Sequence, residues 1–483
     1  MVVFPAGACE IGVDGKTCTA GPGSVSPGSI SRMPGAAGKC RGIAGRGEIL
    51  LRFFLKWLLP RASVAGIGPA ILAVALPALV AAEPQPMAAI QAHPAMRKSL
   101  DWLKANNAWT LAQQISICEI PAPPFTEKAR GVEFARRLQD LGLENIRTDA
   151  EGNVIGEWPG AASSRPLVIF SAHLDTVFPE GSDVRVTRQG TRLTGLGIGD
   201  DCRGLAVLLA VARAFQQNQV RFAGRVLFVG TVGEEGQGDL RGVRYLFEKS
   251  ELKGQVDYFV SVDGAGARVT SGGVGSHRYK VTYRGRGGHS YSAFGMPNPA
   301  HALGRAMARI ADLQVPKSPR TTFNIGMVSG GTSVNSIPIE ASMEVDLRSE
   351  SPLELKALDE RFRAALQMAL TQEKQRWPES AALLELEVKT MGIRPATEAS
   401  DERPIVRAAL EAAQAAGLTI FGTGAGSTDS NIPLALGIPA VTIGGGGAAA
   451  GAHSLDEYYD DRQDGWKGPQ WAALLVASLG GLR

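Results

Sequence analysis

The chain has 483 residues, of which 44% are hydrophobic and 20% charged, so it is typical of a globular protein and long enough for two compact units. Its formal net charge of +3 is uneven, because residues 1–82 hold eight of the 50 basic side chains and only three of the 47 acidic ones. The rest of the chain holds 42 basic and 44 acidic residues, a balance that does not favour a nucleic-acid partner.

An export signal is predicted near the start of the chain. The basic segment RFFLKWLLPR, residues 52–61, precedes an uncharged run at 62–82 that ends in small side chains. This layout is typical of a secretory signal, so we expect cleavage after Ala82 and a secreted or periplasmic protein. A retained membrane anchor is the alternative, since 21 uncharged residues can span a bilayer. The segment upstream is rich in Gly, Pro and Ser, and translation from Met33 is a second alternative.

From about residue 95, apolar runs alternate with amphipathic stretches. We predict strands at 166–175, 225–232 and 256–264, separated by helices at 204–217 and 241–250. This alternation indicates βαβ units, and therefore an α/β fold with a mostly parallel sheet and helices on both faces.

Near residue 272 the pattern changes to strands that alternate apolar and polar residues. The predicted order is strand 277–285, helix 299–313, strands 321–331 and 340–349, helix 352–376 and strand 383–390. Such a β-α-β-β-α-β order is typical of a four-stranded antiparallel sheet with two helices on one face. The α/β pattern returns at about 391, with a helix at 403–417 and a strand at 438–445. We therefore predict an α/β domain at 95–271 and 391–483 that is interrupted by a smaller α+β domain at 272–390.

Acidic and histidine residues recur at the C-terminal ends of the predicted parallel strands, where open α/β sheets place their sites. In chain order these are His173 and Asp175 in AHLD, Asp200 and Asp201 in GDD, Glu234 and Glu235 in GEEG, Asp263 in VDG, and His453 in AHS. Two imidazoles and three carboxylates suit a pair of zinc-like ions, in which each ion takes one His and one carboxylate while a third carboxylate bridges. Residues i and i+2 of a strand lie on the same side, so we expect Asp175 to hydrogen-bond the His173 ring.

Each of these motifs has a simpler interpretation when taken alone. A lone HxD is usually a surface or core-edge pair, and Asp200-Asp201 could cap the helix that follows. Glu234-Glu235 could be solvated loop charges, and Asp263 could belong to a common turn. Five such features at predicted strand ends, in a chain with six histidines, favour a metal site.

The ordered motifs AHLD, GDD, EE, VDG and AHS, with GRGGHS in the inserted segment, resemble the co-catalytic zinc family of peptidase T, carnosinase-like dipeptidases, aminoacylase, succinyl-diaminopimelate desuccinylase and glutamate carboxypeptidases. The resemblance extends from about residue 100 to the C-terminus. It implies a zinc exopeptidase-like catalytic domain, an inserted lid or dimerisation domain, and a homodimer. It also implies a set of metal ligands, namely His173, Asp200, Glu235, Asp263 and His453, with Asp200 bridging.

The same resemblance implies that Glu234 is the general base. We expect hydrolysis of amide bonds in short peptides, of the exopeptidase type, by a water that two divalent ions activate and Glu234 deprotonates. Zinc is the expected metal, with cobalt or manganese as alternatives. An N-acyl-amino-acid deacylase is the alternative function, and a catalytically inactive binding protein is the alternative of another class.

Three further residues are assigned by resemblance to the family, and Asp429 is a candidate from its place in the loop GAGSTDSNIP, residues 424–433. His289 in GRGGHSYSAF matches a histidine that reaches the neighbouring subunit's active site and hydrogen-bonds the reacting group. Asn335 and Arg348 resemble positions that recognise a substrate carboxylate or backbone, although a turn and an exposed strand end would explain them as well. Asp429 is expected to contact a substrate amine or to cap the turn that follows it.

Five cysteines are present, and only Cys118 and Cys202 follow the predicted signal. We expect no disulfide framework, even though an oxidising compartment would permit one. The family often has Lys soon after its Asp-Asp pair, whereas Cys202 and Arg203 stand here. We expect Cys202 to be a small packed side chain rather than an adventitious metal ligand.

Overall fold

The computed structural model describes residues 83–462 and 464–483, which all fall in one compact unit, Pro77–Arg483. The predicted signal, its alternative as an anchor and the alternative start at Met33 lie outside the described residues. Within the described part of the chain, no helix combines the length and apolar character needed to cross a membrane.

The described helices and strands follow the alternation expected from the sequence. The α-helices are α1 Met87–Ala92, α2 Pro94–Ala105, α3 Asn107–Cys118, α4 Lys128–Asp140, α5 Cys202–Gln217, α6 Arg241–Glu248, α7 Pro299–Ala311, α8 Pro352–Arg376, α9 Pro404–Ala415, α10 Asn431–Ala435 and α11 Lys467–Gly480. The strands are β1 Glu144–Thr148, β2 Val154–Glu157, β3 Leu167–His173, β4 Thr187–Gln189, β5 Arg192–Thr194, β6 Arg225–Thr231, β7 Tyr258–Val262, β8 Arg268–Gly273, β9 Gly275–Arg284, β10 Gly288–His289, β11 Thr321–Gly330, β12 Ser336–Ile337, β13 Glu340–Ser349, β14 Glu385–Arg394, β15 Gly422–Gly426, β16 Ala440–Ile443, β17 Ala448–Ala450 and β18 Tyr458–Asp460.

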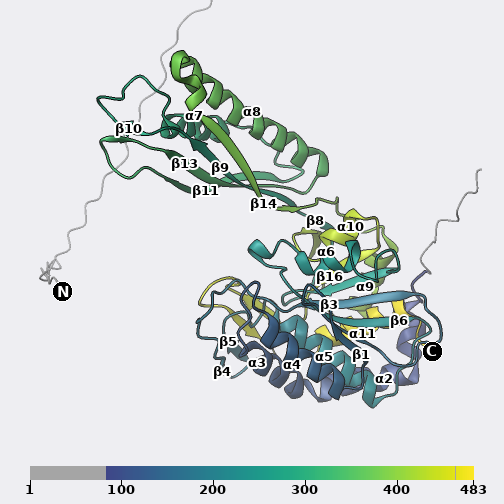
Figure 1. The fold of residues 1–483 in the computed structure, drawn as a ribbon. Helices are drawn as coiled ribbons and strands as arrows, with labels where there is room; N and C mark the ends of the chain where they lie inside the picture. Colours follow the sequence, from purple (N-terminus) through teal and green to yellow (C-terminus); the bar gives the residue numbers. More distant parts are fainter. Residues whose placement is uncertain (1–82, 463) are drawn as a thin grey trace, which may run out of the picture. The chain divides into compact units, whose positions relative to one another are not determined.

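In the described part of the chain, eight strands form one sheet in the order β1-β2-β6-β3-β7-β16-β8-β15 (Figure 1). Its four central strands, β6, β3, β7 and β16, run parallel to one another. Their carboxyl ends therefore lie along one edge of the sheet, which is where ligand sites of open α/β sheets form.

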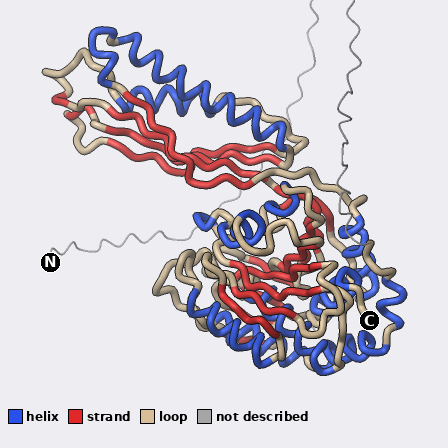
Figure 2. Tube along the Cα trace, turned by 45° about the vertical axis from the view of Figure 1, so that its right-hand side comes forward, coloured by secondary structure: helices blue, strands red, loops and turns tan. Residues whose placement is uncertain are grey.

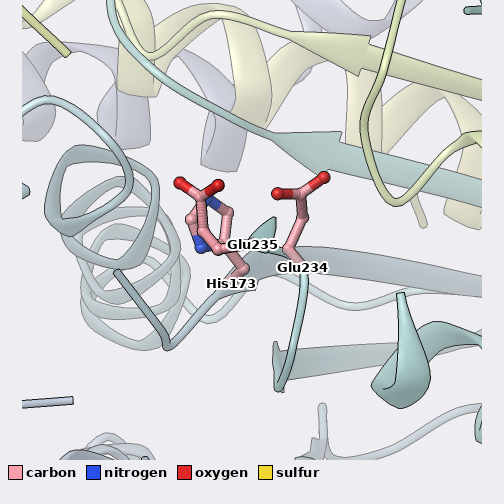
Figure 3. Close-up of side chains that lie close together, drawn as sticks. All are labelled: His173, Glu234 and Glu235. Carbon is pink, nitrogen blue, oxygen red and sulfur yellow. The ribbon is translucent and has the colours of Figure 1, made fainter. Parts of the chain in front are cut away.

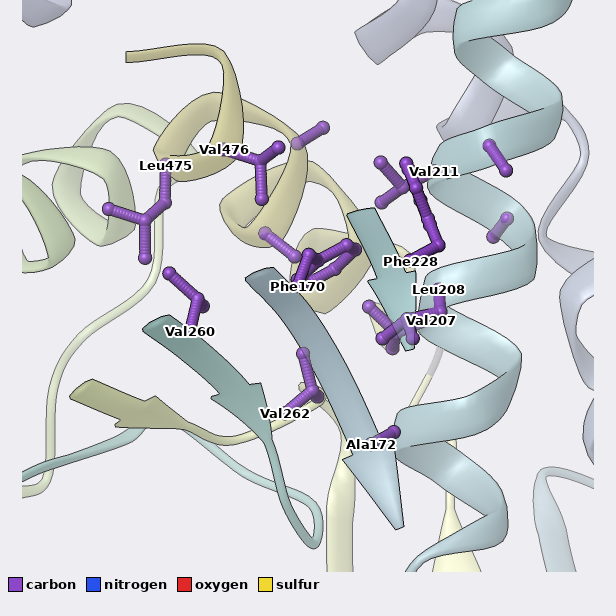
Figure 4. Close-up of a cluster of buried hydrophobic side chains, with 14 of the residues drawn as sticks. Phe170, Ala172, Val207, Leu208, Val211, Phe228, Val260, Val262, Leu475 and Val476 are labelled. Atoms are coloured by element: carbon purple, nitrogen blue, oxygen red, sulfur yellow. The ribbon is translucent and has the colours of Figure 1, made fainter. Parts of the chain in front are cut away.

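Strand β3 shows why this sheet is covered on both faces. Its side chains alternate between two hydrophobic clusters, with Phe170 and Ala172 in one cluster and Leu167 and Ile169 in the other. The first cluster contains buried side chains of α5 and α11 (Figure 4), whereas the second contains side chains of α6 and α10. A strand buried on both faces needs a continuous apolar sequence, and LVIFSAH meets that need.

Four antiparallel strands form a second sheet in the order β11-β13-β9-β14, and α7 and α8 cover one of its faces (Figure 2). Tyr279, Val281 and Tyr283 of β9 point to that face and share a core with Leu358 and Phe362 of α8. The fold class predicted from the sequence is thus confirmed. Strand β14 continues to Arg394, past the predicted end at residue 390.

A disulfide joins Cys118, the last residue of α3, to Cys202, the first residue of α5, with 5.4 Å between their Cα atoms. This corrects our expectation that no disulfide framework exists and that Cys202 is only a packed side chain. The two cysteines are 84 residues apart, and the sequence pattern does not reveal that α3 packs against the start of α5.

Candidate metal centre

His173 ends β3 and is buried. Its Nε2 atom lies 2.9 Å from Asp200 Oδ1, and its Nδ1 atom lies 3.0 Å from the main-chain oxygen of Asp175. The predicted contact from the Asp175 carboxylate is longer, at 3.7 Å. An Nδ1 proton donated to the carbonyl leaves the Nε2 lone pair free to bind a metal ion.

The Asp175 carboxylate instead holds the turn that carries the two glutamates. Its oxygens accept hydrogen bonds from the main-chain N–H groups of Glu234, at 3.1 Å, and Glu235, at 2.9 Å. One residue therefore orients the His173 ring through its main chain and fixes the glutamate turn through its side chain.

The two adjacent aspartates have different surroundings. Asp201 is buried and caps α5 by accepting from the N–H of Gly204 at 2.9 Å, and it also accepts from the N–H groups of His173 and Gly264. Asp200 points away from this cap, and its two carboxylate oxygens lie 2.9 Å from His173 Nε2 and 3.3 Å from His453 Nε2. Asp201 is therefore the residue that caps the helix, and Asp200 is the one whose carboxylate faces the two histidines.

The predicted ligands form two groups of three that share Asp200. In each group the possible ligand atoms lie within 4.8 Å of one another, and the groups are His173, Asp200 and Asp263, and Asp200, Glu235 and His453. One imidazole, one terminal carboxylate and one shared carboxylate per position is a donor set that fits two divalent ions of the zinc type.

Glu234 and Glu235 are adjacent but have different partners. Glu235 Oε1 lies 2.8 Å from His453 Nε2, whereas Glu234 Oε1 accepts a hydrogen bond from Arg394 Nη1 at 3.0 Å. A third group of possible ligands, His173, Glu234 and Glu235, shows that Glu234 still lies next to the centre (Figure 3).

The electrostatics of the centre favour bound cations. Burial raises the pKa of Glu234 well above its ordinary value; Arg394 lowers it, and Glu235 raises it further. Burial and the neighbouring Asp200 raise the pKa of Asp263 to about 7, and hydrogen bonds to Asp200 and Glu235 raise the pKa of His453 to about 10. Burial thus disfavours the ionised carboxylates of Glu234 and Asp263, and positive charge supplied nearby would offset that cost.

Glu457 supports the centre and was missed by the sequence reasoning. Its buried carboxylate accepts hydrogen bonds from the main-chain N–H groups of Gly197, Gly199 and Asp200, at 2.9, 2.8 and 3.0 Å. Because Glu457 follows His453 by four residues, it ties the loop of one candidate ligand to the loop of another. Nothing in the local sequence marks this glutamate.

A cavity of about 290 Å³ opens onto the centre. Its lining comprises Val177, Asp200, Glu234, Glu235, Gly236, Asp263, Arg278, Arg348, Arg394, Ser427 and His453. Arg348 was predicted to meet the substrate, whereas Arg278, Arg394 and Ser427 were not singled out. They come from segments that are distant in the sequence. The pairing of β9 with β14 brings Arg278 and Arg394 together, and Arg394 donates a 2.9 Å hydrogen bond to Ser427 Oγ.

The remaining predicted residues do not line this cavity. His289 is exposed in β10, which pairs with β12, and Asn335 lies next to β12 with its side chain accepting from Ser333 Oγ at 2.6 Å. Asp429 is buried behind the centre, where its Oδ2 atom accepts from Thr231 Oγ1 at 2.6 Å. The predicted roles of these three residues stay predictions.

Comparison with known proteins places the chain in a family. Residues 169–477 match the model of peptidase family M20/M25/M40. Succinyl-diaminopimelate desuccinylase of Bordetella avium is 28% identical over 244 residues. The match covers 46% of this chain and 64% of that enzyme, which is less than two thirds of its length.

Two solved structures share the fold. Aminopeptidase PepT from Bacillus cereus superposes with a TM-score of 0.61 and 20% identity, covering 77% of this chain and 98% of that one. The YXEP protein of Bacillus subtilis, described as a dinuclear metal binding peptidase of the M20 family, gives a TM-score of 0.54 and 18% identity, covering 78% and 99%. The predicted family is confirmed: the chain belongs to peptidase family M20/M25/M40 and is an enzyme of the metallopeptidase and amidohydrolase class.

Proposed function

We propose that this enzyme removes terminal residues from short peptides by metal-dependent hydrolysis of the amide bond. The observation that carries the proposal is the pair of ligand groups sharing Asp200, with Glu234 beside them in one cavity. Glu234 and all five candidate ligands belong to these ligand groups, so nothing favours the alternative of an inactive binding protein.

Two divalent ions are the cofactors in this proposal. His173, Asp200 and Asp263 would hold one, and Asp200, Glu235 and His453 would hold the other. When bound, such ions lower the pKa of a water molecule and polarise the amide carbonyl. Zinc is the proposed metal because imidazole and carboxylate donors suit it, with cobalt and manganese as alternatives.

Glu234 is the proposed general base. Its carboxylate reaches the cavity, is held by Arg394 at 3.0 Å and is buried, so it can accept a proton from water and pass it to the leaving amine. Asp175 fixes the turn that presents it. Arg348, on the lining of the same cavity, can bind a substrate carboxylate through two parallel hydrogen bonds.

An N-acyl-amino-acid deacylase is the second candidate. It needs the same centre, base and carboxylate-binding arginine, and the similarity to succinyl-diaminopimelate desuccinylase favours it.

A homodimer through the inserted domain would bring His289 to the neighbouring active site. Strand β11 is an edge strand of its sheet, and Met327 and Val328 on it are 62% and 55% exposed, which suits pairing with a second copy. A mixture of Glu234→Gln and His289→Ala proteins tests this, because one site of each mixed dimer would hold both intact residues. We expect activity to recover when the two proteins are mixed. If mixing gives no recovery and the His289→Ala protein is active by itself, the proposed role of His289 is wrong.

Export through the N-terminal signal is also part of the proposal. The Cys118–Cys202 disulfide supports it, since disulfides persist in oxidising compartments. N-terminal sequencing of exported protein should begin at Glu83, whereas an intact leader on membrane-bound protein would support the anchor.

A substrate screen tests the function directly. Di- and tripeptides and N-acylated amino acids would be incubated with protein loaded with zinc, cobalt or manganese. Release of a free terminal residue from peptides supports the peptidase, and release only from N-acyl compounds supports the deacylase. No hydrolysis by fully loaded protein would contradict both.

A further inference from the structure

Three arginines come together on the side of the cavity formed by the β11-β13-β9-β14 sheet. Strand β9 pairs with β13 on one side and with β14 on the other, and both Arg348 and Arg394 stand opposite Ser276 of β9. Arg278 follows Ser276 by two residues, so its side chain points to the same face of the sheet. That face is opposite to the one on which Tyr279 stacks against Phe362 of α8.

The three positively charged guanidinium groups form ion pairs with only two carboxylates among the described residues. Arg394 is paired with Glu234, the proposed base, at 3.0 Å. Arg278 and Arg348 share the single carboxylate of Asp346, at 3.6 and 2.7 Å. The three guanidinium groups thus have two carboxylates within ion-pair distance, and Arg278 and Arg348 must share one of them.

Of the two arginines that share Asp346, Arg278 has the longer ion pair, at 3.6 Å. It is held over the glutamate turn by a 2.7 Å hydrogen bond from Nη1 to the main-chain oxygen of Gly236, and only 22% of its side chain is exposed. Burial lowers its pKa and repulsion by Arg394 and Arg348 lowers it further, whereas the carboxylates of Asp346 and Asp239 raise it. A partly buried cation held next to other cations is costly unless an anion joins it.

We propose that Arg278 and Arg348 bind two separate carboxylates of the substrate, so that the enzyme prefers amides carrying a second acidic group. This inference rests on the proposed amide hydrolysis. Arg348 accounts for the carboxylate that any exopeptidase substrate carries, and Arg278 selects the additional one. The cavity of about 290 Å³ suits a ligand of this small size. The second acid belongs either to an acidic residue on the amine side or to a dicarboxylic acyl group.

Paired substrates distinguish these two sources. Ala-Glu is compared with its neutral counterpart Ala-Gln, and N-succinyl-alanine with N-butyryl-alanine. We expect kcat/KM to be roughly 10- to 100-fold higher for the acidic member of at least one pair, as for a lost hydrogen bond to a charged group. The pair that shows the preference identifies where the second carboxylate lies.

Variants of Arg278 assign that preference to this residue. Arg278→Gln should abolish the preference mainly through a higher KM, and Arg278→Lys should keep part of it because the charge remains. Arg284→Gln is the matched control, since Arg284 lies on the same strand with its side chain 52% exposed and paired to Glu340. Equal melting temperatures of the variants and wild type would exclude a folding defect.

A binding measurement separates this inference from the proposed function. Calorimetric titration of metal-loaded protein with glutarate and with butyrate should show tighter binding of glutarate to wild type and a roughly 10-fold loss or more in Arg278→Gln. Failure to hydrolyse any amide, with glutarate still bound through Arg278, would overturn only the hydrolytic function. Efficient hydrolysis without acidic preference, or a preference unchanged in Arg278→Gln, would overturn the inference.

Discussion

The two walls of the cavity carry opposite charges and are built in different ways. The acidic wall comes from residues that follow parallel strands, such as Glu235 in the turn after β6 and Asp263 directly after β7. The basic wall comes from the middle and ends of antiparallel strands, where Arg278, Arg348 and Arg394 meet only through register. Our proposals therefore assign the hydrolytic chemistry to the acidic wall and the selection of substrate to the basic wall.

The substitution Glu234→Gln tests the role of the acidic wall, and we expect it to have the largest effect on activity. Loss of the base should lower kcat by about 10²- to 10⁴-fold, while both metals remain bound because Glu234 is not needed in either shared group. Kinetics combined with metal analysis measures this, and Glu248→Gln, an exposed residue of α6, is the control. Near-normal kcat would remove Glu234 as the base.

A smaller effect is expected from Glu457→Gln. The variant should weaken metal affinity by roughly 10- to 100-fold, as outer-shell changes do, because the loop carrying Asp200 loses charged acceptors for three N–H groups. Competition with a chelator measures the affinity, and the exposed neighbour Asp456 supplies the control variant Asp456→Asn. Discrimination between acidic and neutral substrates should not change. Unaltered metal affinity would show that Glu457 does not position the centre.

The smallest expected effect is a pH dependence of the metal-free protein. The folded-state pKa values of Asp263, about 7, and His453, about 10, are raised above their ordinary values of 3.8 and 6.5. Protons on these groups therefore stabilise the fold at low pH, and this stabilisation is lost as pH rises through those values. Chelation should thus lower Tm by a few degrees more at pH 8 than at pH 6, at about 2–4 °C per kcal/mol.

Scanning calorimetry with and without chelator measures this difference. Asp263→Asn, which removes one titrating group, should reduce it. An equal loss of Tm at both pH values would contradict the electrostatic account of the acidic wall.

The acidic wall could be predicted from the sequence to a greater extent than the basic wall. Apolar runs such as LVIFSAH mark buried strands directly, and the long helix predicted at 352–376 is α8, Pro352–Arg376. The residues after those strands could be placed at one edge of the sheet because parallel strands end together. Their grouping around Asp200 in the structure agrees with that expectation.

The rest depended on contacts that no local pattern contains. From the sequence, Arg278 is an ordinary strand residue and Arg394 lies past the predicted end of its strand at residue 390. Glu457 is one acidic residue among several. The Cys118–Cys202 bridge needed the packing of α3 on α5. The hydrogen bond of His173 to the main chain of Asp175, rather than to its carboxylate, depends on a turn geometry that residue types do not fix.

The central claim is that one wall of this cavity holds two metal ions that share Asp200. Elemental analysis of purified, active protein tests it most directly, together with the same analysis of Asp200→Asn. We predict about two divalent transition-metal ions per chain in the wild type, as in two-metal hydrolytic sites, and loss of both in the variant. Full amide hydrolysis by protein that holds no such metal would contradict the account.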